Sequence, residues 1–206
     1  AIGAVAALAA LGTRRARGSR SLSVDEILGF VPELRMRWYN ASHGEAVVDP
    51  EEVDDFYLSD HPYIPPGVKS WWEEKTGTRY IGHGNYRVVF SVGDGTVVKL
   101  ALDNQGQSEN QDEVDSWNEY HDTPVGQMLA PMIEGDEDAV VMRQAVPLSK
   151  RMFELNPSIE ADFRKADRRL NELAFASGHN INDTAALGNW GVLDGKIVLI
   201  DYPEEF

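Results

Sequence analysis

The fold is decided by a glycine-rich turn that enters an apolar strand, Ile81-Gly82-His83-Gly84-Asn85-Tyr86-Arg87-Val88-Val89-Phe90. Glycines in such a turn expose backbone N–H groups that no Cβ obstructs, which suits the binding of phosphate oxygens. Many ordinary hairpins are equally rich in glycine, so the turn alone is weak evidence. Its meaning depends on the segments that follow it along the chain.

The next strand contains one lysine in an apolar run, Val97-Val98-Lys99-Leu100-Ala101. A charge that faces a protein core is destabilising by several kcal/mol unless it is paired. Lys99 therefore either faces water or has a carboxylate partner. Glu113 is the natural partner, because Trp117 lies one turn later and would anchor its helix. Glu109 and Glu119 fit this role less well.

The C-terminal part of the chain contains a predicted long helix, then a polar loop, then a hairpin with polar residues at both ends. A long helix is predicted over 157–177, with Ile159, Phe163, Leu170 and Leu173 on one stripe. It is followed by the polar loop His179-Asn180-Ile181-Asn182-Asp183, by Asn189, and by a hairpin over 191–201 that turns at Asp194-Gly195. That hairpin runs into Leu199-Ile200-Asp201-Tyr202-Pro203, so an amide and a carboxylate flank it.

Other elements are predicted from helix-capping residues, from glycine and proline that end helices and strands, and from the alternation of apolar and polar residues. The segment 21–78 reads as helical, with a capping box at Ser23–Glu26, helix starts at Pro32 and at Asp49-Pro50, and a short helix over 68–75 stopped by Gly77. Its aromatic residues are predicted to be core or interface. Strands are predicted over 86–92 and 96–102, joined by Gly93-Asp94-Gly95, then a helix over 109–121 and a hairpin of 129–133 with 139–142.

The region 79–203 resembles the protein-kinase-like fold, and is most similar to the small, divergent kinase-like proteins of tailed viruses and bacteria. Kinases carry a glycine-rich loop, a strand lysine, a helix glutamate, a catalytic loop and a metal-binding aspartate in this order. The resemblance implies an α+β, truncated two-lobe architecture. An antiparallel N-lobe sheet with an αC-like helix would span 79–145, and a minimal helical C-lobe would span 146–206. An arm (1–20) and a helical preface (21–78) would precede them.

The resemblance also implies ATP and Mg²⁺ as cofactors, and it assigns roles to residues. The nucleotide-binding residues would be Gly82, His83, Gly84, Asn85, Lys99 and Glu113, with Met142–Ala145 as the hinge that meets adenine. Lys99 and Asp183 would be the catalytic residues, Asp183 as the base, and Asn189 and Asp201 would hold the metal.

Several positions depart from the kinase pattern. Arg87 stands where the third loop glycine would be, and Pro203 replaces the glycine after the metal-binding aspartate. Asn189 lies six residues after Asp183 rather than the usual five. No activation segment or substrate-binding helix follows Asp201 in this sequence.

These departures leave two functions open. One is a small ATP- and Mg²⁺-dependent phosphotransferase, or a nucleotide-binding protein with weak or lost activity. The other is a non-catalytic, pseudokinase-like scaffold, such as a structural component of a virus particle or another large assembly. An unrelated α+β domain is a third reading of the same pattern.

The chain is strongly acidic, with a net charge of −15 over 206 residues and no cysteine. Disulfides and cysteine-ligated metals are therefore excluded. Acid-rich, lysine-poor surfaces suit high salt, where charge repulsion is screened. The composition favours a halophilic source, with an ordinary acidic protein as the alternative. A soluble protein of a cell interior or of a virus particle is expected in either case.

The N-terminal arm has the opposite charge. Residues 1–20 contain four arginines (Arg14, Arg15, Arg17, Arg20) and no acid, whereas 21–206 contain 15 basic and 34 acidic residues. The apolar stretch 1–11 would span only about 16 Å as a helix, too short for a bilayer core of roughly 30 Å. No transmembrane segment is expected. The arm could dock on its own chain or on a protein partner, contact nucleic acid or an anionic surface, or be a remnant of a longer precursor. Docking on a protein partner is the expectation.

Overall fold

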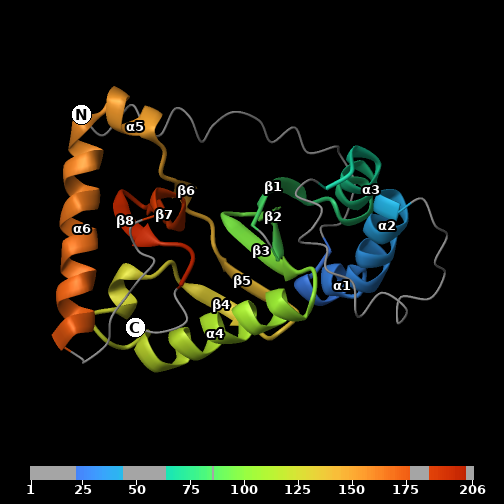
Figure 1. Cartoon of the computed structure of the whole chain (residues 1–206), viewed down its shortest axis with the longest axis horizontal. Coiled ribbons are helices and arrows are strands. Elements are labelled where there is room, and N and C mark those ends of the chain that lie inside the picture. Colours follow the sequence, from blue (N-terminus) through green and yellow to red (C-terminus); the bar gives the residue numbers. More distant parts are fainter. Residues whose placement is uncertain (1–21, 44–63, 85, 177–185, 203–206) are drawn as a thin grey trace.

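The fold is α+β, with two antiparallel sheets and helices around them (Figure 1). The computed structural model describes residues 22–43, 64–84, 86–176 and 186–202. The described elements are α1 (Val24–Leu28), α2 (Val31–His43), α3 (Pro66–Thr76), β1 (Arg79–His83), β2 (Arg87–Gly93), β3 (Thr96–Ala101), α4 (Asn104–Tyr120), β4 (Met132–Gly135), β5 (Ala139–Arg143), β6 (Val146–Pro147), α5 (Lys150–Leu155), α6 (Pro157–Ala176), β7 (Trp190–Leu193) and β8 (Lys196–Leu199). Short 3-10 turns precede β4 and β7, at Gly126–Met128 and Leu187–Asn189.

The larger sheet has the strand order β1-β2-β3-β5-β4, and the smaller one has the order β6-β7-β8. Two hairpins, β2-β3 and β7-β8, each turn on an Asp-Gly pair. Asp94 and Gly95 have φ values of 53° and 75°, and Asp194 and Gly195 have φ values of 49° and 80°. A two-residue turn with both φ values positive matches the twist of the flanking strands, and Asp-Gly favours it. These turns confirm both predicted hairpins and fix their registers.

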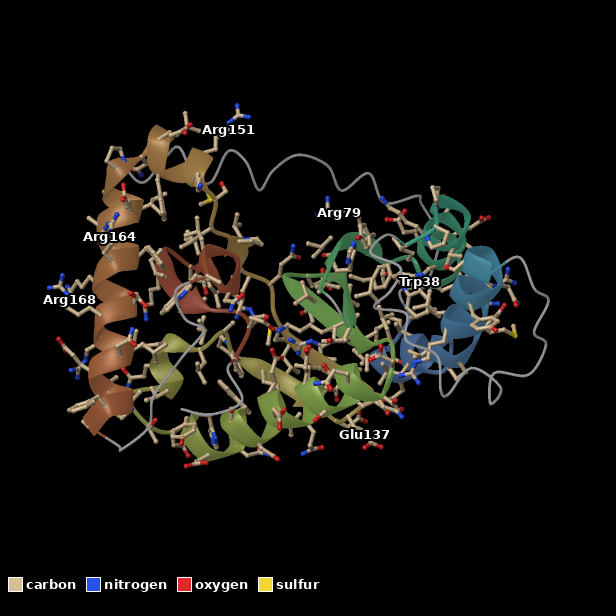
Figure 2. The ribbon with its side chains drawn as sticks, in the orientation of Figure 1. Trp38, Arg79, Glu137, Arg151, Arg164 and Arg168 are labelled. Atoms are coloured by element: carbon tan, nitrogen blue, oxygen red, sulfur yellow. The ribbon has the colours of Figure 1, made fainter. Side chains whose placement is uncertain are left out.

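The helical preface packs against one face of the larger sheet, on the right of Figure 1. Trp38 of α2 and Trp72 of α3 are 1% and 0% exposed, and the Trp72 ring centroid lies 5.1 Å from that of Phe90 on β2. Figure 2 labels Trp38 beside this sheet. Trp38 and Trp72 are therefore core, as predicted. The residues that form this core from the sheet are Val88, Phe90, Val98, Leu100, Ala139 and Val141.

A second core joins the opposite face of the larger sheet to the smaller sheet and to α6. Leu129 forms a bridge with Leu199, and the Ala130 N–H donates to the Leu199 carbonyl at 2.8 Å. The predicted apolar stripe of α6 packs here, with Leu170 fully buried. In Figure 1, β7 and β8 lie between α6 and the larger sheet. On the outer side of α6, Arg168 points away from the molecule (Figure 2).

Several predicted boundaries are confirmed and two are wrong. The strand predicted over 129–133 is observed as β4, which begins only at Met132 and runs to Gly135. The capping box at Ser23 and Glu26 is present, and Gly77, with a φ of 71°, ends α3. The helix predicted to start at Glu109 begins instead at Asn104, because the Asp103 carboxylate accepts a hydrogen bond from the Gly106 N–H at 3.0 Å. Helix α5 was not predicted. The arm, the helix start at Asp49-Pro50 and the predicted last residue of the helix over 157–177 lie outside the described residues.

Among the described helices, none has the length and apolar character needed to cross a membrane.

Gly106 lets the first turn of α4 approach the glycine-rich turn. A Cβ at this position would lie 2.3 Å from the Tyr86 carbonyl oxygen. Overpacking of this kind is destabilising by about 1–3 kcal/mol, so Gly106→Ala should lower the free energy of unfolding by that amount in urea titrations.

Gly67, in the first turn of α3, is the matched control. A Cβ there would meet no atom within 4 Å. Gly67→Ala should be neutral, or stabilising by up to about 1 kcal/mol, because alanine is the better helix former. Equal effects of the two substitutions would contradict the close approach of α4 to Tyr86.

Candidate functional site

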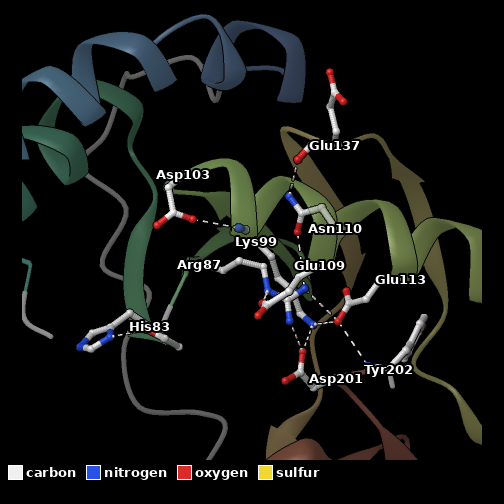
Figure 3. A network of polar contacts seen from close by, with 12 residues as sticks. His83, Arg87, Lys99, Asp103, Glu109, Asn110, Glu113, Glu137, Asp201 and Tyr202 are labelled. Atoms are coloured by element: carbon white, nitrogen blue, oxygen red, sulfur yellow. Dashed lines mark hydrogen bonds and ion pairs between the residues drawn. The ribbon is translucent and has the colours of Figure 1, made fainter. Parts of the chain in front are cut away.

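A buried lysine joins two carboxylates from distant parts of the chain (Figure 3). Lys99 Nζ lies 2.6 Å from Glu113 Oε1 on α4 and 3.0 Å from Asp201 Oδ1, which follows β8. The Lys99 and Glu113 side chains are 8% and 1% exposed, whereas the Asp201 side chain is 41% exposed. Asp201 therefore marks the mouth of the cluster, and Lys99 and Glu113 mark its floor.

Strand alternation explains why Lys99 faces α4. Val98 and Leu100 point into the core shared with the helical preface. Because successive side chains of a strand point to opposite faces, Lys99 points to the other face. It pairs in register with Val89 and Val140, whose side chains lie on the same face.

Helix α4 presents its glutamate to that face. Asn110, Glu113 and Ser116 are the buried polar residues on α4, and they recur every three positions along one side of the helix. The sequence-derived choice of Glu113 over Glu109 and Glu119 as the partner of Lys99 is confirmed. Glu113 Oε2 is buried and has no hydrogen-bond partner among the described residues.

Arg87, the departure from the glycine pattern, is the centre of the cluster. Its Nε lies 2.9 Å from Glu109 Oε2, its Nη1 lies 3.1 Å from Glu113 Oε1, and its Nη2 lies 2.5 Å from Asp201 Oδ1. Sequence reasoning did not include Arg87 or Glu109 among the site residues. A signal was present, because alternation along β2 puts Arg87 on the same face as Val89, and hence as Lys99.

Further hydrogen bonds fix the carboxylates and the helix. The Tyr202 N–H donates to Glu113 Oε1 at 3.2 Å, and the Tyr202 hydroxyl donates to the Ala130 carbonyl. The Asn110 side chain donates to the Glu137 carbonyl at 3.0 Å, next to β5. These bonds tie α4, the larger sheet and the segment after β8 into one polar network.

The charges in the cluster shift one another's pKa values. Burial raises the pKa of Glu113 and of Glu109, against the opposing effect of the cations beside them. Burial would also raise the pKa of Asp201, but Lys99 and Arg87 together bring it far below its usual range. For Arg87, burial acts to lower the pKa, and its three carboxylate partners reverse that shift. Asp201 is therefore a carboxylate under all ordinary conditions.

The glycine-rich turn lies beside this cluster and is open. A Cβ at Gly82 or at Gly84 would meet no atom within 4 Å. The Gly84 N–H donates to the Arg87 carbonyl at 2.9 Å, and His83 Nδ1 lies 2.9 Å from the Gly84 carbonyl oxygen. A side chain at either glycine would therefore meet no steric obstacle, and the Gly84 N–H already has its acceptor within the turn.

The remaining predicted site residues are placed in part. Asn189 ends a 3-10 turn, and its carbonyl accepts a hydrogen bond from the Ile200 N–H at 2.7 Å. Because Ile200 directly precedes Asp201 in the chain, this bond holds the Asn189 backbone close to Asp201. The segment Met142–Ala145 runs from β5 to the start of β6 and links the two sheets. In it, the Gln144 N–H donates to the Gly95 carbonyl. Asn85, Asp183 and the loop 179–183 lie outside the described residues.

The described residues do not fit Mg²⁺ in the way that the resemblance implies. Asp201 Oδ1 is shared by two cations, Lys99 and Arg87, so a divalent ion on this carboxylate would face two like charges at close range. No group of three or more histidine or acidic side chains suited to a metal ion occurs in the part of the chain that the structure describes.

Comparison with known proteins gives no relative for this chain: no family model, no curated protein and no solved structure matches it. The interpretation of the site therefore depends on its own geometry.

A double-mutant cycle tests the buried ion pair. Lys99→Met and Glu113→Gln should each lower the free energy of unfolding by about 1–3 kcal/mol, because each removes one ion pair from a buried group that keeps a second partner, Arg87 for Glu113 and Asp201 for Lys99. Together they should cost less than the sum of the two by about 1–3 kcal/mol. Guanidinium titrations at pH 7 measure these differences.

Lys196→Met serves as the control, since Lys196 is an exposed lysine on a strand of the smaller sheet. It should change the stability by no more than about 0.5 kcal/mol. Strict additivity of Lys99→Met and Glu113→Gln would show that the two side chains do not interact.

Proposed function

We propose that this chain is a kinase-like, nucleotide-binding protein that takes ATP, with a phosphotransferase activity that is weak or lost. The observation that carries the proposal is the contact of one buried lysine with a helix glutamate and with an aspartate 102 residues farther along the chain. A strand lysine that is paired with a helix glutamate is the arrangement that positions nucleotide phosphates in kinases.

The order of the elements supports a truncated, two-lobe, kinase-like architecture. An antiparallel sheet with a glycine-rich turn comes first, and the lysine strand runs directly into the helix that bears Glu113. A connecting segment then leads to a smaller sheet, to the long helix α6 and to Asp201. Catalytic parts contributed by separate elements around one cleft are typical of phosphoryl transfer, which depends on positioning and electrostatics.

In this proposal the turn at Gly82 and Gly84 covers the phosphates, and the Lys99 ammonium group contacts and orients them. Asp183 would accept the proton of the substrate, and Asn189 would lie beside the reacting phosphate. The departures at Arg87 and Pro203 argue for reduced turnover, because they change the two places where a kinase needs glycine.

A non-catalytic scaffold is the second candidate, and one observation favours it. Each nitrogen of the Arg87 guanidinium already contacts a carboxylate, so the cluster is charge-paired with no ligand present. A fold stabilised in this way could serve as a structural component of a virus particle or of another large assembly. Its arm of arginines would then contact a protein partner, nucleic acid or an anionic surface.

Titration with a fluorescent ATP analogue in the presence of Mg²⁺ tests the proposed function. We expect saturable binding that falls at least tenfold in Lys99→Met, because a charge-assisted hydrogen bond contributes about 1.5–3 kcal/mol. Lys196→Met should bind like the natural chain. Circular dichroism must show that each variant is folded at the temperature of the titration.

Absence of binding at millimolar analogue by the folded natural chain would eliminate the nucleotide-binding proposal. Co-purification of the protein as a stoichiometric member of a larger particle, together with that absence, would favour the scaffold.

A further inference from the structure

The position of Arg87 has a consequence for the kind of ligand that the cluster accepts. Its guanidinium lies between α4 and the segment after β8, with Nη2 2.5 Å from the carboxylate that the resemblance assigns to a metal (Figure 3). The Arg87 side chain is 10% exposed, so it is part of the floor and not a mobile surface group. A fixed positive charge therefore already lies beside Asp201.

A divalent cation and Arg87 compete for the same carboxylate. Lys99 Nζ and Arg87 Nη2 both contact Asp201 Oδ1, and a metal ion on this residue would be repelled by both. In a phosphate site, the metal ion serves to neutralise phosphate charge. A guanidinium can serve the same end, since its planar fork of N–H donors matches phosphate oxygens.

The carboxylates of the cluster must leave room for an anion. With every group ionised, two cations face three carboxylates, Glu109, Glu113 and Asp201. Glu109 is the member that can move away, because its side chain is 27% exposed and Arg87 is its partner among the described residues. Burial acts to raise the pKa of Glu109, and Arg87 acts to lower it. A phosphate oxygen that replaces Glu109 takes over its contact with Arg87, so that the two cations then face two carboxylates and the phosphate.

We propose that Arg87 takes the place of a divalent cation at Asp201, and that Arg87 and Lys99 together hold the phosphates of a nucleotide without a metal. Glu109 is the internal anion that the phosphate displaces. This inference rests on the proposed nucleotide binding and specifies its chemistry: the ligand is the metal-free nucleotide, and its phosphate contacts a guanidinium.

The first experiment compares nucleotide binding with and without metal. The fluorescent ATP analogue is titrated into the natural chain in Mg²⁺ and in EDTA, and the two dissociation constants should agree within about twofold. Arg87→Gln should weaken binding in EDTA by about ten- to a hundredfold, the range expected for a charge-assisted hydrogen bond. Glu109→Gln should strengthen it severalfold, because the competing anion is gone and Arg87 remains in place.

Arg79→Gln is the matched control, because Arg79 is an exposed arginine at the start of β1. It should bind the analogue as the natural chain does. Binding by the natural chain that needs Mg²⁺ would overturn the inference, and so would a Glu109→Gln variant that binds more weakly than the natural chain.

The second experiment uses the metal alone, so it does not depend on nucleotide binding. Mn²⁺ is added to ¹⁵N-labelled protein, and paramagnetic broadening of the Tyr202 amide is compared with that of other amides. The natural chain should show no preferential broadening there. Arg87→Gln should show it, and Arg87→Gln combined with Asp201→Asn should lose it again. Preferential broadening in the natural chain would mean that a metal site coexists with Arg87, and the inference would be wrong.

The two experiments separate the two proposals. If no protein binds the analogue in any condition, nucleotide binding is disproved and with it the phosphate part of this inference. The Mn²⁺ experiment then still decides whether Arg87 occupies the place of a cation at Asp201.

Discussion

The structure depends on the burial of one positive charge, that of Lys99, in the middle of an apolar strand. A buried ammonium group requires carboxylate partners, and here they come from α4 and from the segment after β8. The requirement therefore reaches across 102 residues of sequence and holds the smaller sheet against the larger one. The apolar contacts around Leu129 and Leu199 add packing at the same junction, but they are less directional.

The second buried cation changes what this junction can do. Arg87 brings Glu109 into the network and pairs with Asp201, so both buried cations already contact carboxylates in the absence of a ligand. Such a site needs no ligand to be folded, and an anion can contact Arg87 only if it displaces a carboxylate such as Glu109. The same feature thus explains why a scaffold is the competing interpretation, and why a nucleotide would be taken without Mg²⁺.

Much of this arrangement could be predicted from the sequence, where the signals are local. Asp-Gly pairs indicated two hairpins and Gly77 the end of α3. A lysine in an apolar run indicated a carboxylate partner, and Trp117 one turn later favoured Glu113. The start of α4 was missed because its first turn is polar and shows no apolar periodicity. The residue that marks this start is the N-cap Asp103, which was not recognised as a cap. Arg87 was noted as a missing glycine, and its role became visible only when β2 and β3 were in register. Contacts of Asp201 with residues more than a hundred positions earlier have no local signature.

A crystal structure of the natural chain, grown with a non-hydrolysable ATP analogue and EDTA, tests the central claim most directly. The account predicts that Lys99 contacts both Glu113 and Asp201, that a phosphate lies against Arg87 beneath the turn at Gly82 and Gly84, and that Glu109 has turned away. A structure in which Lys99 faces solvent, or in which the analogue's phosphates are held far from Arg87, would contradict it.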